Sequence, residues 1–173
     1  TVLREAFNRD KKEYVMFDAL PPRPPVLCPG CPHRGFFYMV HKLNLYATGD
    51  IGCYTLGAFP PLDAMDTCVC MGASIGNALG MEKAIPELAR KTVAVIGDST
   101  FLHTGVPELM DVVYNKGKTT VVVLDNRTTA MTGHQDHPGT GRTLMGEQTK
   151  SIMPEDIARA MGVDDIHVVD AYD

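Results

Sequence analysis

The chain has 173 residues, 45% of them hydrophobic, and its formal net charge at pH 7 is −5. This length and apolar content are enough for one folded domain with a sizeable core, and they argue against a disordered chain. The sequence has neither an apolar run of the roughly 20 residues that a membrane helix needs nor a secretion-signal pattern. Its negative charge gives no support to nucleic-acid binding, so we expect a soluble cytoplasmic protein without membrane or nucleic-acid partners.

A stretch rich in proline, residues 20–25, lies near the N-terminus and predicts a stiff, extended linker. We therefore expect residues 1–25 to form a linker or N-terminal extension. Residues 26–173 are expected to form one domain, because strand and helix patterns alternate through them.

The five cysteines are an odd number in a chain without a signal sequence, which argues against a disulfide framework. Cys28 and Cys31 form a C-x-x-C pair in which Gly30 permits a tight turn with both sulfurs on one side. Cys53 ends a short predicted strand and could reach the same place. Three thiolates there suggest an iron–sulfur cluster lacking one ligand, a zinc site completed by His33 or another cysteine, or a redox dithiol. The alternative is that Cys53, and with it Cys68 and Cys70, are small buried side chains without chemistry.

The central part of the chain alternates predicted strands and helices, which indicates an α/β fold with a doubly wound, mostly parallel sheet. Apolar spacing predicts helices over residues 36–43, 72–90 and 104–116, and strands over residues 45–51, 93–97 and 121–124. The last two strands are continuous apolar runs and are expected to be covered on both faces. Gly76 and Gly80 are expected to allow close approach of a neighbour. Thr104 is expected to cap the third helix and Gly117 to end it.

The end of the sequence predicts one more helix and one more strand. The helix covers residues 154–161, with Pro154 in its first turn and Gly162 closing it. Residues 167–173 resemble a core strand that has just ended. Because a domain rarely finishes on such a strand, we expect the chain to be a fragment truncated at its C-terminus.

Polar side chains follow two of the predicted strands: Asp98 comes directly after the first apolar run, and Asn126 follows the second. A right-handed crossover would put both at the same end of neighbouring strands, where open α/β sheets bind ligands. The N-terminus of the intervening helix points there too and favours an anion such as a diphosphate. A carboxylate and an amide oxygen suit Mg²⁺, with diphosphate oxygens as further ligands. The alternative is that both residues only form turns at strand ends.

These residues resemble a known cofactor motif. Gly97-Asp98-Ser99, a spacer and Asp125-Asn126 are similar to the thiamine diphosphate motif, usually written GDG, spacer, NN, from which Ser99 and Asp125 depart. The resemblance implies a thiamine diphosphate-binding fold of the pyrophosphate-binding type, in which Asp98, Asn126 and the backbone carbonyl of Thr128 ligate Mg²⁺. The further candidate contacts to the cofactor are Gly52, Cys53, Gly72, Gly97, Ser99, Thr100, Thr132 and Gly133.

The order of several motifs extends the resemblance: C-P-G-C-P-H-R-G at residues 28–35, T-G-D-I-G-C at 48–53, G-D-S at 97–99 and D-N-R-T-T-A-M-T-G at 125–133. This order resembles the thiamine diphosphate region of the α subunits of indolepyruvate:ferredoxin oxidoreductases, within the 2-oxoacid:ferredoxin oxidoreductase family. In related enzymes, cysteines at the positions of Cys28, Cys31 and Cys53 ligate a [4Fe–4S] cluster, and a more C-terminal cysteine is the fourth ligand. No cysteine follows Cys70 in this sequence.

The resemblance implies an oxidoreductase that decarboxylates 2-oxoacids, such as the arylpyruvate indolepyruvate, to acyl-CoA and passes the electrons to ferredoxin. It implies as partners a pyrimidine-binding domain of the same or another chain, a second subunit, ferredoxin, coenzyme A and the 2-oxoacid. In this family the Glu that activates the cofactor lies on the pyrimidine-binding domain. We therefore expect the chain alone to bind the cofactor weakly and to catalyse little.

Histidines near the predicted site are candidates for acid–base or substrate contacts. His33, His103 and His134 are the catalytic candidates, and His137 lies in the same loop as His134. This loop, residues 127–143, is expected to fold over the diphosphate. The alternative for His134 and His137 is that both are solvent-exposed loop residues.

Two other functions stay open. A non-redox thiamine diphosphate enzyme, a 2-oxoacid decarboxylase or an acetolactate-synthase-like carboligase, would share Asp98 and Asn126 but would have no use for the cysteines. A metal- or cluster-binding module would use Cys28, Cys31 and Cys53 structurally, and its sheet would have no catalytic role.

Overall fold

This computed structural model describes Phe7 and residues 21–172. Residues 21–26 are exposed and without regular secondary structure, as expected for an extended linker. Apart from these residues and Phe7, the predicted linker lies outside the described part of the chain, and its boundary at residue 25 stays a prediction. The packed core begins at Leu27, which is buried.

Four parallel strands form the sheet, in the order β2-β1-β3-β4. They are β1 (Tyr46–Gly49), β2 (Thr67–Cys68), β3 (Thr92–Gly97) and β4 (Thr120–Leu124). The parallel sheet and the strands β1, β3 and β4 confirm the prediction, whereas β2 was not predicted. β3 is buried throughout, but the prediction of full burial is wrong for β4, which stays half-buried at the edge of the described sheet.

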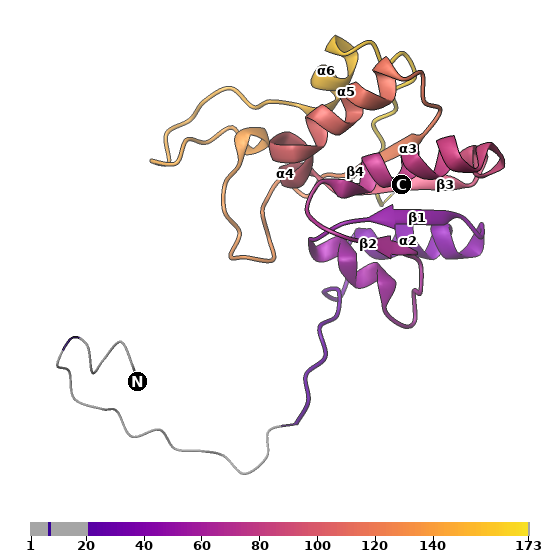
Figure 1. Ribbon diagram of the computed structural model, residues 1–173. Helices are drawn as coiled ribbons and strands as arrows, with labels where there is room; N and C mark the ends of the chain where they lie inside the picture. Colours follow the sequence, from indigo (N-terminus) through magenta and orange to yellow (C-terminus); the bar gives the residue numbers. More distant parts are fainter. Residues whose placement is uncertain (1–6, 8–20, 173) are drawn as a thin grey trace.

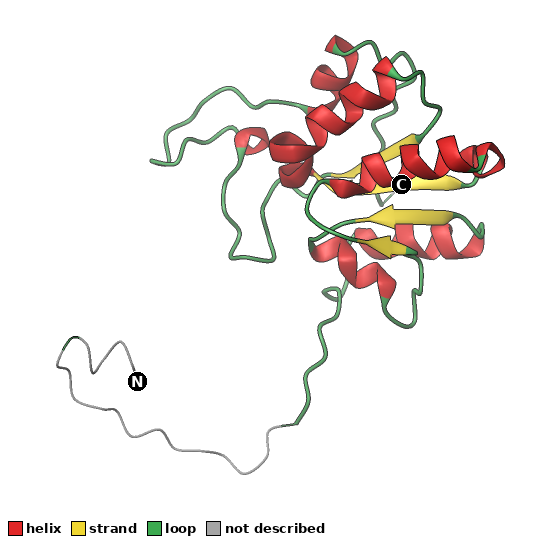
Figure 2. Cartoon of the chain, in the orientation of Figure 1, coloured by secondary structure: helices red, strands yellow, loops and turns green. Residues whose placement is uncertain are grey.

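Helices cover both faces of the sheet, which confirms the doubly wound α/β fold (Figure 1, Figure 2). One face carries α2 (His33–Lys42) and the 3-10 helix η1 (Cys53–Ala58), and the other carries α3 (Ala73–Ala84) and α5 (Val106–Tyr114). Successive side chains of a strand point to opposite faces, so β3 contributes to both cores. Val95 lies in the core with Phe37 of α2, and Ile96 lies in the core with Ile75 of α3.

The first two predicted helices differ from their predicted bounds. The helix expected over residues 72–90 ends at Ala84, and the 3-10 helix η2 (Pro86–Arg90) follows. Proline lacks the N–H that a continuing helix needs and restricts the residue before it, so the break falls at Ile85. α2 begins at His33 rather than at residue 36. Within the part of the chain that the structure describes, we find no helix whose length and apolar character would let it cross a lipid bilayer.

The helix after β3 begins earlier than predicted. A turn of α-helix, α4 (Asp98–Thr100), continues through the π-helical segment η3 (Phe101–Gly105) into α5. Thr104 is therefore not a cap, because it lies inside the helix and its hydroxyl donates to the Thr100 carbonyl at 3.0 Å. After α5, Lys116 rather than Gly117 adopts the left-handed conformation, with φ of +51°. The early start places the N-terminus of this helix directly at the carboxyl end of β3.

The C-terminal region confirms the predicted helix but not the strand. α6 (Pro154–Ala160) is followed by Gly162 with φ of +91°. The described residues after Gly162 form no strand, and Val168 is 75% exposed. The apolar run of residues 167–172 is short and is interrupted by Asp170, and His167 at its start pairs with Asp165 at 2.8 Å.

Three helical glycines, Gly76, Gly80 and Gly105, differ in how closely other residues pack against them. A Cβ on Gly76 would lie 2.1 Å from Glu108 Oε2, so close approach is confirmed there. The same expectation is wrong for Gly80, whose Cβ would meet nothing within 4 Å. Gly105 is the most constrained of the three, because its Cβ would lie 2.7 Å from Cδ1 of the fully buried Ile96.

Alanine at two of these helical glycines should have opposite effects. Gly105→Ala overpacks the core beside Ile96 and should lower the free energy of unfolding by about 1–3 kcal/mol. Gly80→Ala adds a methyl group in open space and should raise it by about 0.5–1 kcal/mol through the lower entropy of the unfolded chain. Urea unfolding of both variants measures the two changes. Equal effects of the same sign would contradict this packing.

Candidate functional site

The carboxyl edge of the sheet contains a topological switch point between β1 and β3. The chain leaves β1 toward β2 on one side, and it places β3 and β4 on the other side. Ligands of open α/β sheets bind at such a point, because the loops that leave it diverge. Polar residues follow all three strands that surround it: Asp50 after β1, Asp98 after β3, and Asn126 shortly after β4.

A cavity of about 100 Å³, which we call the strand-end cavity, lies at this edge. It brings together most of the predicted site residues: His33, Gly52, Cys53, Gly97, Asp98, Ser99, Thr100, Asn126, Thr128 and Thr132. Its other lining residues are Ile51, Tyr54, Met71, Leu124, Thr129, Ala130 and Met131. The predicted residues Gly72, Gly133, His103 and His134 do not line it.

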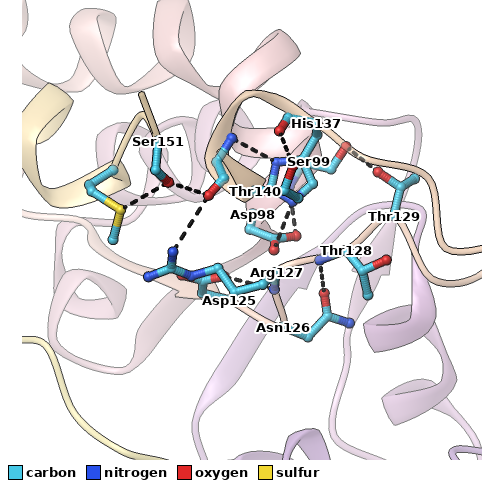
Figure 3. A network of polar contacts seen from close by, with 12 residues as sticks. Asp98, Ser99, Asp125, Asn126, Arg127, Thr128, Thr129, His137, Thr140 and Ser151 are labelled. Atoms are coloured by element: carbon cyan, nitrogen blue, oxygen red, sulfur yellow. Dashed lines mark hydrogen bonds and ion pairs between the residues drawn. The ribbon is translucent and has the colours of Figure 1, made fainter. Parts of the chain in front are cut away.

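Asp98 is the buried acidic group of the strand-end cavity, with 3% of its surface exposed. Its Oδ1 accepts the backbone N–H of Ser99 at 2.7 Å, and its Oδ2 lies 3.2 Å from Nε2 of His137 (Figure 3). Burial raises the pKa of Asp98 above its usual range, and the nearby Asp125 raises it further, against the lowering effect of the Ser99 N–H. A cation bound beside the carboxylate would act in the opposite direction and lower this pKa.

Asn126 and Thr128 form a tight turn after β4. Asn126 Oδ1 accepts the backbone N–H of Thr128 at 3.2 Å, and Arg127 between them has φ of +56° (Figure 3). Asn126 is therefore a turn former, as the alternative interpretation expected. Because an amide oxygen has two lone pairs, this hydrogen bond leaves one for a ligand.

The residues of the strand-end cavity fit a hard cation. Asp98, Asn126 and the Thr128 carbonyl would provide only oxygen ligands, and oxygen is the ligand atom that Mg²⁺ prefers. Residues 21–172 contain no set of three or more His, Cys, Asp or Glu side chains placed to hold a metal. This finding speaks against a metal site formed by three or more of these side chains in the described residues. It does not bear on the predicted Mg²⁺ ligands, because Asp98 is the only residue of those types among them.

Asp50 is a second buried carboxylate that sequence reasoning missed, with 0% of its surface exposed. Its Oδ2 accepts the backbone N–H of Gly72 at 3.0 Å, and the Tyr54 hydroxyl donates to its Oδ1. The Tyr54 ring lines the strand-end cavity, and a Cβ on Gly97 would lie 2.7 Å from it. Gly72 therefore contributes through its backbone to Asp50, and Gly97 leaves room for Tyr54. The available signal was that Asp50, like Asp98, comes directly after a strand.

The cysteine pair forms the predicted turn. The Cys28 carbonyl accepts the Cys31 N–H at 3.1 Å, and Gly30 has φ of +71°. Cys31 and Cys53 both pack against the core that contains Phe37. Burial raises the pKa of Cys53, and the charges of Cys31 and Cys28 raise it further. The three thiols do not form a metal-holding set within the described residues, so the predicted [4Fe–4S] cluster and the zinc site with His33 stay predictions.

The other two cysteines, Cys68 and Cys70, are exposed, and the prediction of burial is wrong for them. Both belong to the segment from β2 to the start of α3, which runs along the surface at the carboxyl edge of the sheet.

The histidines divide into buried and exposed groups. His33 is buried and lines the strand-end cavity, and burial lowers its pKa. His137 is also buried, at 8% exposure, so its alternative assignment as an exposed loop residue is wrong. His103 and His134 are exposed and lie outside the cavity lining. His103 lies inside the helix that starts at Asp98, in the segment η3, rather than before it.

Asp50→Asn should remove a pH-dependent loss of stability. Because burial raises the pKa of Asp50 above its usual 3.8, folding disfavours the ionised form. The free energy of unfolding therefore falls as the pH rises from about 3.8 through the raised pKa, and the asparagine variant lacks this decline. Urea unfolding at a series of pH values should show the variant gaining stability relative to the unchanged chain over that range. A pH-independent difference would contradict this assignment.

Comparison with known proteins gives the family. The thiamine pyrophosphate enzyme, C-terminal TPP binding domain family matches residues 50–173. The chain is 49% identical to indolepyruvate oxidoreductase subunit IorA of Archaeoglobus fulgidus, over 88% of this chain and 25% of that protein. It is 48% identical to the subunit IorA of Pyrococcus horikoshii, over 95% of this chain and 27% of that protein. The chain thus spans about a quarter of the length of these curated relatives.

A solved structure supports the fold. The 2-oxoglutarate:ferredoxin oxidoreductase from Magnetococcus marinus, with 2-oxoglutarate, coenzyme A and succinyl-CoA bound, superposes with a TM-score of 0.65. The match covers 82% of this chain and 53% of that one at 21% identity, so it speaks for the fold alone. The relatives confirm the resemblance to the thiamine diphosphate region of indolepyruvate oxidoreductase α subunits. The chain belongs to the family of C-terminal TPP-binding domains of thiamine pyrophosphate enzymes.

Proposed function

We propose that this chain is the thiamine diphosphate- and Mg²⁺-binding part of an oxidoreductase that decarboxylates 2-oxoacids to acyl-CoA and passes the electrons to ferredoxin. The observation that carries the proposal is the meeting of the buried Asp98 with Asn126 in one cavity at the switch point of the sheet. Thiamine diphosphate, when bound, supplies the electron sink for loss of CO₂.

The polar side of the strand-end cavity would hold the diphosphate end of the cofactor. Asp98, Asn126 and the Thr128 carbonyl would hold Mg²⁺, which would offset the negative charge of the diphosphate. The helix that starts at Asp98 adds its positive dipole end. The Ser99 hydroxyl is held by the Thr129 hydroxyl at 2.9 Å, which ties the start of this helix to the loop after β4.

The apolar side of the strand-end cavity would exclude water and receive a partner. Three apolar side chains that line the cavity, Ile51, Met71 and Met131, are 40–51% exposed. The cavity is therefore open to solvent on this side. A pyrimidine-binding domain that covers these side chains would bury this apolar surface and would bring the activating Glu. The chain alone should therefore bind the cofactor weakly and catalyse little.

The substrate class rests on the relatives. The names of the similar proteins point to indolepyruvate, and the apolar lining of the cavity suits an arylpyruvate. Coenzyme A and ferredoxin are suggested by the solved 2-oxoglutarate enzyme. His33 is the candidate contact to the substrate, because it is the buried histidine that lines the cavity.

A non-redox thiamine diphosphate enzyme is the second candidate function. It stays a candidate because the matching family, the C-terminal TPP binding domain, is that of thiamine pyrophosphate enzymes in general. Both functions use Asp98 and Asn126 in the same way, so binding of the cofactor does not distinguish them.

Removal of the metal ligands should weaken the Mg²⁺-dependent binding of thiamine diphosphate. Asp98→Ala deletes the charged ligand and Asn126→Ala deletes the amide oxygen, so calorimetric titration should show weaker binding for both and the greater loss for Asp98. Asp156→Ala is the matched control, because it removes an acidic side chain from the exposed surface of α6. Unchanged Mg²⁺-dependent binding in both cavity variants would refute the metal assignment.

Iron analysis separates the two candidate functions. If Cys31 ligates a [4Fe–4S] cluster, Cys31→Ser should lower the iron and sulfide content of the anaerobically purified assembly by about four each. Cys70→Ser should leave both unchanged, because Cys70 is an exposed cysteine outside the C-x-x-C pair. Equal iron in the two variants, together with decarboxylation that needs no ferredoxin, would favour the non-redox enzyme.

A further inference from the structure

His137 makes two directed contacts that nothing in the metal assignment requires. Its side chain is buried, Nε2 lies 3.2 Å from Oδ2 of Asp98, and Nδ1 accepts the backbone N–H of Gly139 at 3.1 Å (Figure 3). Both ring nitrogens are therefore engaged, one with the proposed metal ligand and one with the protein backbone.

The contact with Gly139 decides which nitrogen carries the proton. A backbone N–H can only donate, so Nδ1 must present its lone pair and cannot be protonated. The proton of the neutral ring then lies on Nε2, which points at the Asp98 carboxylate and donates to it. A hydrogen bond to an ionised acceptor is stronger than one between neutral groups.

The loop holds the ring in this position. His137 precedes the one-turn helix η4 (Pro138–Thr140), and its carbonyl accepts the N–H of Thr140 at 2.9 Å. A Cβ on Gly139 would lie 2.8 Å from Cε1 of His137, so only glycine lets the ring and the turn pack together. The Gly139 carbonyl in turn accepts the Ser151 hydroxyl, which fixes the far side of the turn.

We propose that His137 is a positioning residue that holds the Asp98 carboxylate, through an Nε2–H donor fixed by Gly139, in the orientation that binds the metal. This role rests on the proposed function. Asp98 Oδ1 accepts the Ser99 N–H and Oδ2 accepts His137, so each oxygen keeps a free lone pair and the carboxylate cannot rotate. Partners of this kind typically change metal affinity by about 10–100-fold when they are removed.

The tautomer is tested first on the full chain, without metal or cofactor. Nitrogen NMR of the ¹⁵N-labelled histidines should show His137 with its proton on Nε2 and an unprotonated Nδ1. His137→Ala identifies the signal. A proton on Nδ1, alone or with one on Nε2, would overturn the proposal.

Two substitutions test the positioning role. His137→Gln places an amide near Nε2 and keeps a donor to Asp98, whereas His137→Asn reaches only the Nδ1 position and keeps the contact to Gly139. Mn²⁺ affinity in the presence of thiamine diphosphate, read by electron paramagnetic resonance, should fall about 10–100-fold for His137→Asn and much less for His137→Gln. Gly139→Ala, which displaces the ring without removing it, should weaken binding as well.

The outcomes separate this role from the proposed function. If the unchanged chain, assembled with its partner domain, binds no Mn²⁺ in the presence of the cofactor, the proposed function fails, and the role of His137 fails with it. If the unchanged chain binds, but His137→Asn binds as tightly or His137→Gln loses as much as His137→Asn, only the role of His137 is overturned. Thermal unfolding of each variant shows that the comparison is made between folded chains.

Discussion

A carboxylate buried at the end of the central strand is the constraint around which the carboxyl edge of this domain is organised. Asp98 is almost inaccessible, and burial disfavours its charged form. The fold meets this cost with fixed donors, the Ser99 N–H and the His137 ring, rather than with a lysine or arginine contact to Asp98. These hydrogen bonds fix the orientation of the carboxylate and leave a lone pair on each oxygen for a cation.

The sheet places this group, and the glycines around it make the space. β3 lies between β1 and β4, so the residue after it is surrounded by the loops that leave both neighbours. Tyr54 from the loop after β1 reaches over Gly97 and is fixed by Asp50. The loop after β4 returns past Ser99 and delivers His137. Each strand end thus supplies one wall of the strand-end cavity, and no single element could form it.

Patterns local in sequence predicted the strands β1, β3 and β4 and the polar residues that follow β3 and β4, but neither β2 nor the role of Asp50 after β1. Continuous apolar runs identify β3 and β4, and Asp98 and Asn126 stand out because a polar side chain follows each run. Interactions between distant segments could not be predicted. His137 lies 39 positions from Asp98, and only the folded loop shows that it is buried against that carboxylate. The start of the helix at Asp98 was missed because Thr104 offered a local capping signal, which the tertiary fold overrides.

Diffraction from crystals of the chain with its partner domain, thiamine diphosphate and Mn²⁺ tests the central claim most directly, because the anomalous signal locates the metal. The account predicts one peak bonded to Asp98, Asn126 Oδ1 and the Thr128 carbonyl at about 2.0–2.3 Å, next to the diphosphate. A cofactor in the strand-end cavity whose metal lies away from Asp98, or a cofactor bound elsewhere on the domain, would contradict it.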